Sequence, residues 1–357
     1  VGTKTKAIVA GAILVSIVLA FFVPSATARA GAVVPILLGM VAAFGLAKDS
    51  RLAALLIITA VQAVSIWNIG IKTGAAQNMV ALGFIEEKFD KTITWSEWFL
   101  YAAPFSIIMS IVLFFIMIKL IKPETDVIEG GKEVIAKQLA ELGPLKGSEI
   151  RLIIASITLL FVWASEGALH LFDSTTVTII AIALLLAPKI GVYSWSEVER
   201  LIPWGTIIVF SVGIALGSVL LNTQGAQWLS DTTFGTLGLD SMPLLATIAV
   251  VTLFNILIHL GFASATSLAS ALIPVFIVLA STITADGDQQ IGFVLIQQFV
   301  ISFGFLLPIS APQNMLAYGT GAFTTKDFLK SGIPLTIIAY ILVMIFSATY
   351  WQWIGLL

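Results

Sequence analysis

The 357-residue sequence contains no cysteine and only two histidines, and just 11% of its residues are charged. Without cysteine, neither a disulfide framework nor a thiolate metal site can form. The net charge of −2 leaves no basic excess of the kind that binds nucleic acid. Apolar residues make up 59% of the chain, more than a water-soluble protein of this length needs to fill its core.

Apolar runs of about 20 residues, long enough to cross a bilayer as a helix, recur along the chain. We therefore expect an all-α polytopic membrane protein, integral and multi-pass, in the plasma (inner) membrane of a bacterium. The one long hydrophilic stretch, 122–150, is predicted to be a cytoplasmic linker between a first repeat, 1–121, and a second, 151–357. Three spans should open the second repeat, at about 152–171, 174–192 and 204–222.

Two short polar motifs occur twice, once in each repeat. Ser-Ala-Thr stands at 25–27 and again at 264–266, and in each copy a proline follows ten residues after the serine. Gln-Asn-Met stands at 77–79 and again at 313–315. Repetition of polar motifs inside apolar sequence indicates a binding site that is built from two homologous halves.

Each Ser-Ala-Thr motif divides an apolar run so that neither side spans comfortably, which predicts a re-entrant hairpin with its tip buried in protein. The first hairpin should run through 5–23 and 28–46, and the second through 242–262 and 267–283. Each Gln-Asn-Met motif follows a helix that is predicted to break, at 72–78 and at 308–314. Discontinuous helices of this kind mark binding sites in secondary transporters.

The distribution of Lys and Arg predicts how the hairpins are oriented. Basic residues flank the first hairpin and fill the linker, whereas the flanks of the second hairpin, 223–241 and 284–290, carry only acidic ones. Since Lys and Arg concentrate on cytoplasmic loops, the first hairpin should enter from inside and the second from outside. The two halves would then form an inverted-topology repeat, with the site near the bilayer midplane. If they are true repeats, roughly 90 N-terminal residues, about three helices, are absent from this sequence.

The tips and breaks are suited to small organic anions. Each tip precedes a helix whose first N–H groups have no intrahelical partner and whose dipole is positive at that end. Two such ends facing one another suit a molecule with a carboxylate at each end. The predicted substrate-binding residues are Ser25, Ala26, Thr27, Arg29, Lys72, Gly74, Asn78, His259, Ser264, Ala265, Thr266, Ala311, Pro312 and Asn314.

Three basic residues at membrane depth sharpen this interpretation, because an intramembrane charge is costly and usually functional. Arg29 lies in the first turn after its tip, where a cation is misplaced unless an anion sits beside it. It is therefore predicted to serve a substrate carboxylate or to act as a counter-charge, with a packing role as the alternative. His259 could equally be a neutral interior residue, and Lys72 could extend to an interface.

An enzyme is not expected, since no nucleophile–base pair or metal-ligand cluster stands out in the sequence. An anion channel and a non-transporting carboxylate receptor remain alternatives. Paired hairpins with polar tips suit alternating access better than a continuous pore.

Three segments carry a resemblance to a known family. They are Pro-Ser-Ala-Thr-Ala-Arg at 24–29, Ala-Ser-Ala-Thr at 263–266, and Ser-Phe-Gly-Phe-Leu-Leu-Pro-Ile-Ser-Ala-Pro-Gln-Asn at 302–314. With these the chain resembles the divalent anion/sodium symporter family, nearest to its citrate and 2-oxoglutarate/malate translocator branch. The resemblance implies transport of di- or tricarboxylates such as succinate, malate, 2-oxoglutarate or citrate. It also implies a homodimer, with a scaffold and an elevator-type transport domain that contains both hairpins and both broken helices.

One departure from the family pattern bears on the mechanism. The family's tips typically read Ser-Asn-Thr, whereas Ala26 and Ala265 stand here where the asparagines serve substrate and sodium. We therefore expect a carboxylate/carboxylate antiporter with Arg29 and His259 as fixed counter-charges. Na⁺-coupled symport is the alternative, and no other cofactor is expected. A sodium ion would then lie near Ser25, Gly74, Asn78, Ser264, Ser310 and Asn314.

Overall fold

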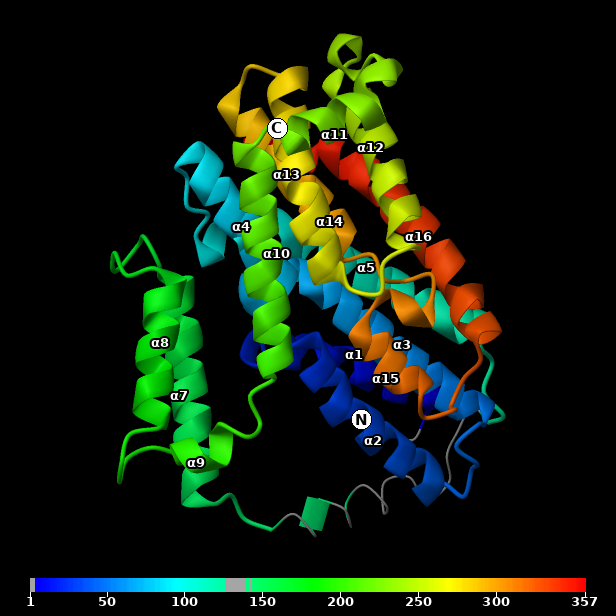
Figure 1. Ribbon diagram of the computed structural model, residues 1–357. Coiled ribbons are helices and arrows are strands. Elements are labelled where there is room, and N and C mark those ends of the chain that lie inside the picture. Colours follow the sequence, from blue (N-terminus) through cyan, green and yellow to red (C-terminus); the bar gives the residue numbers. More distant parts are fainter. Residues whose placement is uncertain (1–3, 126–135, 137–138, 141–142) are drawn as a thin grey trace.

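The computed structural model describes residues 4–125, 136, 139–140 and 143–357, and parts of the predicted linker therefore lie outside the described residues. All regular structure in the described ranges is helical (Figure 1). Among these helices, eight are long and apolar enough to cross a membrane. A helix satisfies its own backbone hydrogen bonds, which lipid cannot do, so these apolar runs fold as helices. The chain is an integral, multi-pass membrane protein.

The segment predicted as the first repeat folds as two interrupted helices followed by a long one. Helices α1 (Thr5–Phe22) and α2 (Ala26–Ala43) are separated by a short break. Helix α3 (Arg51–Gly70) ends at the 3₁₀ turn η1 (Lys72–Gly74), after which α4 (Ala76–Phe89) resumes. Helix α5 (Trp95–Leu120) completes this part. The predicted break at 72–78 is thus confirmed, although helical structure resumes already at Ala76.

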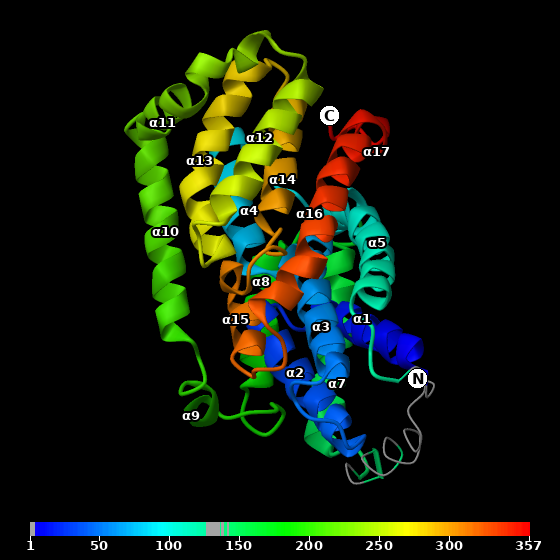
Figure 2. The same cartoon turned by 90° about the vertical axis from the view of Figure 1, so that its right-hand side faces the viewer.

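The segment predicted as the second repeat shows the same order of helices and breaks. Helices α12 (Leu244–His259) and α13 (Ala265–Ile283) flank the second break. Helix α14 (Gly287–Ile301) is followed by the 3₁₀ turn η4 (Pro308–Ser310) and the short α15 (Pro312–Tyr318). Helices α16 (Thr325–Ala348) and α17 (Tyr350–Trp353) end the chain. Figure 2 shows α16 along one face of the molecule beside α5, against which it packs.

Between these parts lie α7 (Gly147–Ala164), α8 (Ser174–Leu185), α9 (Trp195–Val198), α10 (Trp204–Asn222), α11 (Gly225–Phe234) and the turns η2 (Gly235–Leu237) and η3 (Leu239–Ser241). Two of the three predicted spans end earlier than expected. The span predicted at 152–171 stops at Ala164, where a turn with Gly167 at positive φ follows. The span predicted at 174–192 stops at Leu185, so α8 is only about 18 Å long.

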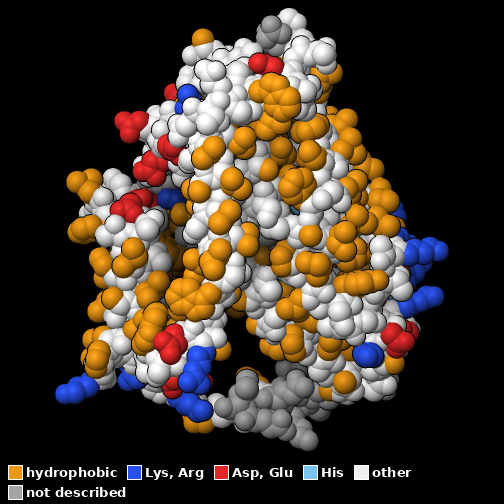
Figure 3. All heavy atoms as spheres, viewed as in Figure 1, with side chains coloured by type: hydrophobic (Ala, Val, Ile, Leu, Met, Phe, Trp, Pro, Cys, Tyr) orange, Lys and Arg blue, Asp and Glu red, His pale blue; other side chains and the backbone are white. Residues whose placement is uncertain are grey.

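Two central helices form the core around which the breaks are placed. Every residue of α3 except Arg51 is buried, and α14 is buried from Ile291 to Ile301. Helix α3 packs against α1, α2 and α5, while α14 packs against α12, α13 and α4. Because each central helix ends at a break, the irregular backbone lies deep inside the protein, where other groups can satisfy it. Apolar side chains elsewhere face outward and cover much of the surface in Figure 3.

Candidate functional site

A cavity of about 960 Å³ lies where both tips and both breaks converge. The tips contribute Ser25, Ala26, Thr27, Ser264, Ala265 and Thr266, and the breaks contribute Ala75, Ala76, Gln77, Ala311, Pro312 and Gln313. The space-filling view shows the molecule hollowed near the lower end of α10, whose first residues also line the cavity (Figure 3). Segments from opposite ends of the sequence therefore meet in one site.

The two tips have matching geometry. Ser25 is the N-cap of α2, and its hydroxyl accepts a hydrogen bond from the N–H of Ala28 at 3.2 Å. Ser264 is the N-cap of α13 and accepts from the N–H of Ser267 at 3.3 Å. The helices therefore begin one residue after each serine, so the Ala and Thr of each motif belong to a first helical turn. Two helix N-termini, each with free N–H groups and a positive dipole end, open on one cavity.

The two N-cap serines, Ser25 and Ser264, should contribute about equally to substrate binding. We expect Ser25→Ala and Ser264→Ala each to weaken substrate binding several-fold, because each removes one cavity hydroxyl and loosens the helix N-terminus that faces the cavity. The lost cap also costs about 1 kcal/mol of stability. The measurement is the apparent affinity for substrate in purified variants. Ser281→Ala is the control, since this exposed serine on α13 bonds only the carbonyl of Ile277. A large effect of one tip and none of the other would contradict the matched arrangement.

The asparagine of each Gln-Asn motif holds the ends of its broken helix together. The Asn78 side chain donates from Nδ2 to the carbonyl of Asn68 at 2.7 Å. The Asn314 side chain donates in the same way to the carbonyl of Gly304, also at 2.7 Å. Both asparagines are buried and neither lines the cavity, so they position the backbone of the breaks and do not contact a molecule in the cavity.

The glutamines of the same motifs connect the two repeats. Gln77 donates from Nε2 to the hydroxyl of Ser302, just after α14, at 3.2 Å. Gln313 donates to the hydroxyl of Ser65 on α3 at 3.1 Å. The helices also pack across the two repeats, since α2 contacts α15 and α13 contacts α4. Each hairpin is therefore seated on the broken helix of the other repeat.

Arg29 is fully buried and points from α2 to the first break. Its Nη2 donates to the side-chain oxygen of Asn68 and, at 2.8 Å, to the carbonyl of Gly74. Its Nε and Nη1 have no partner among the described residues. The guanidinium thus places a positive charge beneath the first tip, directly on a carbonyl that the break leaves free.

His259 makes the corresponding contact in the second repeat. Its Nε2 lies 3.2 Å from the carbonyl of Ser310, and its ring also lines the cavity. Ser310 stands three residues before Gln313, just as Gly74 stands three residues before Gln77. The equivalent carbonyls of the two breaks therefore each contact a basic side chain from the hairpin of the same repeat.

Five of the predicted residues do not line the cavity: Arg29, Gly74, Asn78 and Asn314 lie behind its wall, and Lys72 lies elsewhere. The ammonium of Lys72 is buried and lies 3.5 Å from Glu166 Oε2, in the turn between α7 and α8. The expectation that Lys72 contacts substrate came from its position beside the first break, but its side chain points away from that break. It therefore occupies a separate polar cluster.

Sequence reasoning missed several residues of the site. Asn68 is a polar residue near the end of an apolar run, a signal that would have indicated a role. Thr206 and Phe210 on α10 also line the cavity, together with Ile207 and Val209. No local pattern separates this wall from an ordinary membrane span, so only the packing of α10 reveals it.

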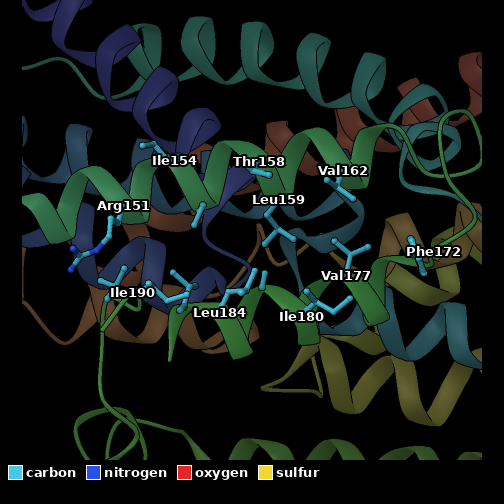
Figure 4. A pocket seen from close by; sticks show the side chains of 14 residues that line it. Arg151, Ile154, Thr158, Leu159, Val162, Phe172, Val177, Ile180, Leu184 and Ile190 are labelled. Carbon is cyan, nitrogen blue, oxygen red and sulfur yellow. The ribbon is translucent and has the colours of Figure 1, made fainter. Parts of the chain in front are cut away.

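A second pocket, of about 520 Å³, lies between α7 and α8 and is drawn in Figure 4. Its lining is apolar apart from Arg151 and Thr158, with residues such as Leu159 and Ile180 between them. It lacks the converging polar groups of the first cavity, so the first cavity is the candidate functional site.

Comparison with known proteins identifies the family of the chain. The family described as "Sodium:sulfate symporter transmembrane region" matches the chain over residues 1–357. The chain is 47% identical over 355 residues to a "Membrane protein" of Cupriavidus necator, covering 99% of this chain and 69% of that protein.

Two more distant relatives carry transport names. The sodium-dependent dicarboxylate transporter SdcS of Staphylococcus saprophyticus is 24% identical, over 96% of this chain and 69% of that protein. The citrate/succinate antiporter of Escherichia coli K12 is 26% identical, over 93% of this chain and 68% of that protein. The family consists of transporters rather than enzymes, as the sequence predicted. The chain belongs to the sodium:sulfate symporter family, the divalent anion/sodium symporters that its motifs resemble.

Proposed function

We propose that this protein is a carboxylate transporter that exchanges one small di- or tricarboxylate for another, with Arg29 and His259 as fixed counter-charges. Succinate, malate, 2-oxoglutarate and citrate are the candidate class of substrates. Relatives named as a citrate/succinate antiporter and a sodium-dependent dicarboxylate transporter support this class. The two helix N-termini that open on one cavity suit a substrate with a carboxylate at each end.

The observation that carries the proposal is the pairing of basic side chains with equivalent carbonyls. Gly74 O accepts from Arg29, and Ser310 O lies within hydrogen-bond distance of His259. Such free carbonyls are the hard oxygen ligands that hold Na⁺ at the breaks of sodium-coupled transporters. A guanidinium stays protonated in proteins, so a sodium ion at Gly74 would meet a fixed positive charge. The residues at this position therefore fit sodium poorly.

Fixed counter-charges favour exchange for an electrostatic reason. A bound dicarboxylate neutralises the buried basic groups, so the loaded protein carries little net charge at membrane depth. The empty protein keeps an uncompensated charge, which is costly in an apolar surrounding. Only the loaded form would then change conformation readily, which couples the exit of one substrate to the entry of another.

The proposed architecture is an inverted-topology repeat that works as an elevator in a homodimer. The matched tips, breaks and exchanged glutamine bonds support a pseudo-two-fold relation between the repeats. The elevator body would comprise both re-entrant hairpins and both broken helices. Helices α7, α8 and α10 would belong to the scaffold. Helix α7 packs against α8 and contacts the body at α1, and α10 packs against the body at α13 and α4.

Flux in proteoliposomes tests the proposal. Labelled succinate, malate, 2-oxoglutarate or citrate is supplied outside, with or without unlabelled dicarboxylate inside, in Na⁺ or choline buffer. We expect uptake to require internal substrate and to be the same in both buffers. Uptake into empty vesicles that depends on a Na⁺ gradient would contradict exchange and would establish symport.

Sodium-coupled symport is the second candidate. The carbonyls and amides at the breaks favour it, as does the name of the relative SdcS. A channel would instead give continuous uncoupled current, and a receptor would bind carboxylate without flux.

A further inference from the structure

Lys72 lies in a buried polar cluster that the proposed transport site does not use. Its Nζ is 3.5 Å from Glu166 Oε2 and 3.2 Å from the hydroxyl of Ser174, the first residue of α8. The side chains of Lys72 and Glu166 are only 5% and 7% exposed. The other ion pair in the described part of the chain, Lys91–Asp288, has exposures of 45% and 71%. The Lys72–Glu166 pair is therefore set apart by its burial.

One carboxylate oxygen connects three elements in this cluster. Glu166 Oε2 accepts a hydrogen bond from the Ser174 hydroxyl at 2.6 Å. It also accepts from the backbone N–H of Trp95, the first residue of α5, at 3.2 Å. Together with Lys72, these contacts tie the α7–α8 turn to the break η1 and to the start of α5.

The cluster joins two parts that otherwise meet sparsely. Helices α7 and α8 stand beside the rest of the molecule in Figure 1, and α7 contacts it at α1 and α5. Lys72 itself belongs to the body that carries the cavity. Its backbone carbonyl accepts from Asn78 Nδ2 at 3.3 Å, and it lies two residues before Gly74, which binds Arg29. The ion pair is thus connected through one rigid turn to the groups beneath the first tip.

We propose that Lys72 and Glu166 form a state-specific lock between the α7–α8 pair and the substrate-carrying body. The proposal rests on the proposed elevator, in which these two parts move relative to one another. A buried ion pair is stable while its partners are in contact, and separation leaves each charge needing water or a new partner. Such a contact stabilises one of two alternative packings of an interface, so the protein switches between two distinct conformations.

The absence of cysteine allows a direct test with introduced cysteine pairs. Ser218 on α10 donates to Glu87 on α4 at 3.0 Å, so this contact joins the proposed scaffold to the body in the same conformation. In a Ser218→Cys/Glu87→Cys background, cross-linking by Hg²⁺ reports how much of the protein holds that conformation. We expect Glu166→Gln to lower the cross-linking rate about tenfold or more, because Lys72 loses its buried partner.

Asp288→Asn is the matched control, because it removes the other ion pair in the described residues, which is exposed and lies within the body. It should leave the cross-linking rate unchanged. The double variant Lys72→Met/Glu166→Gln leaves no unpaired charge, so it covers the case in which the single variant fails to fold. The lock predicts that this double variant also cross-links slowly. If the double variant folds and cross-links at the wild-type rate, the lock is overturned, and Lys72 and Glu166 have only a packing role.

The same double-cysteine protein distinguishes a failure of the lock from a failure of the proposed transport mechanism. If cross-linked protein with Lys72 and Glu166 intact exchanges dicarboxylate at the full rate, the elevator itself is wrong and the lock falls with it. If cross-linking stops exchange but Glu166→Gln leaves the cross-linking rate unchanged, only the lock is overturned.

Discussion

Arg29→Gln is expected to lower dicarboxylate exchange in proteoliposomes about a hundredfold. Losing a desolvated charge that faces an anion costs about 3 kcal/mol, which corresponds to that factor. Glutamine places a neutral polar amide near the position of Arg29 Nε and adds no bulk between α2 and the first break, although it is too short to replace the bonds of Nη2. The variant should therefore fold and reach the membrane while the counter-charge is gone.

Two further variants make this result specific. Arg29→Lys keeps the charge and should retain more exchange than Arg29→Gln. Arg200→Gln, at an exposed arginine in the turn after α9, should exchange at the wild-type rate. Exchange by Arg29→Gln within threefold of wild type would exclude Arg29 as the counter-charge.

Gly332→Ala should lower the stability of the protein strongly. A Cβ at Gly332 on α16 would lie 2.0 Å from the carbonyl oxygen of Phe305, a backbone atom that cannot rotate away. The same carbonyl accepts a hydrogen bond from Gln62 at 3.0 Å, so moving it also disturbs α3. We expect a loss of at least about 2 kcal/mol of stability, seen as a lower unfolding temperature by tryptophan fluorescence in detergent.

Gly83→Ala on α4 is the matched control. Nothing lies within 4 Å of a Cβ at that position, and alanine favours a helix interior over glycine by about 1 kcal/mol. The unfolding temperature of this variant should stay level or rise. If both substitutions lowered the unfolding temperature equally, the contact with the Phe305 carbonyl would not explain the effect of Gly332→Ala.

The breaks and tips were predictable because their signals are local. A serine inside an apolar run can cap a new helix, and the structure begins α2 and α13 directly after Ser25 and Ser264. Helix α3 ends at Gly70, next to the predicted break, whereas α14 already ends at Ile301, well before the predicted break at 308–314. The lengths of α7 and α8 were overestimated, since apolar composition continues past the turns that end them.

The amino-acid sequence by itself determined that the chain is a multi-pass helical membrane protein and where its polar interruptions lie. These features depend on composition and on near neighbours along the chain. Only the tertiary structure decided which distant groups meet: Arg29 at Gly74, His259 at Ser310, and Lys72 at Glu166. Long basic side chains reach several ångströms in many directions, so their partners depend on how helices pack. The same packing brings α10 to the cavity and turns an ordinary apolar span into one wall of the site.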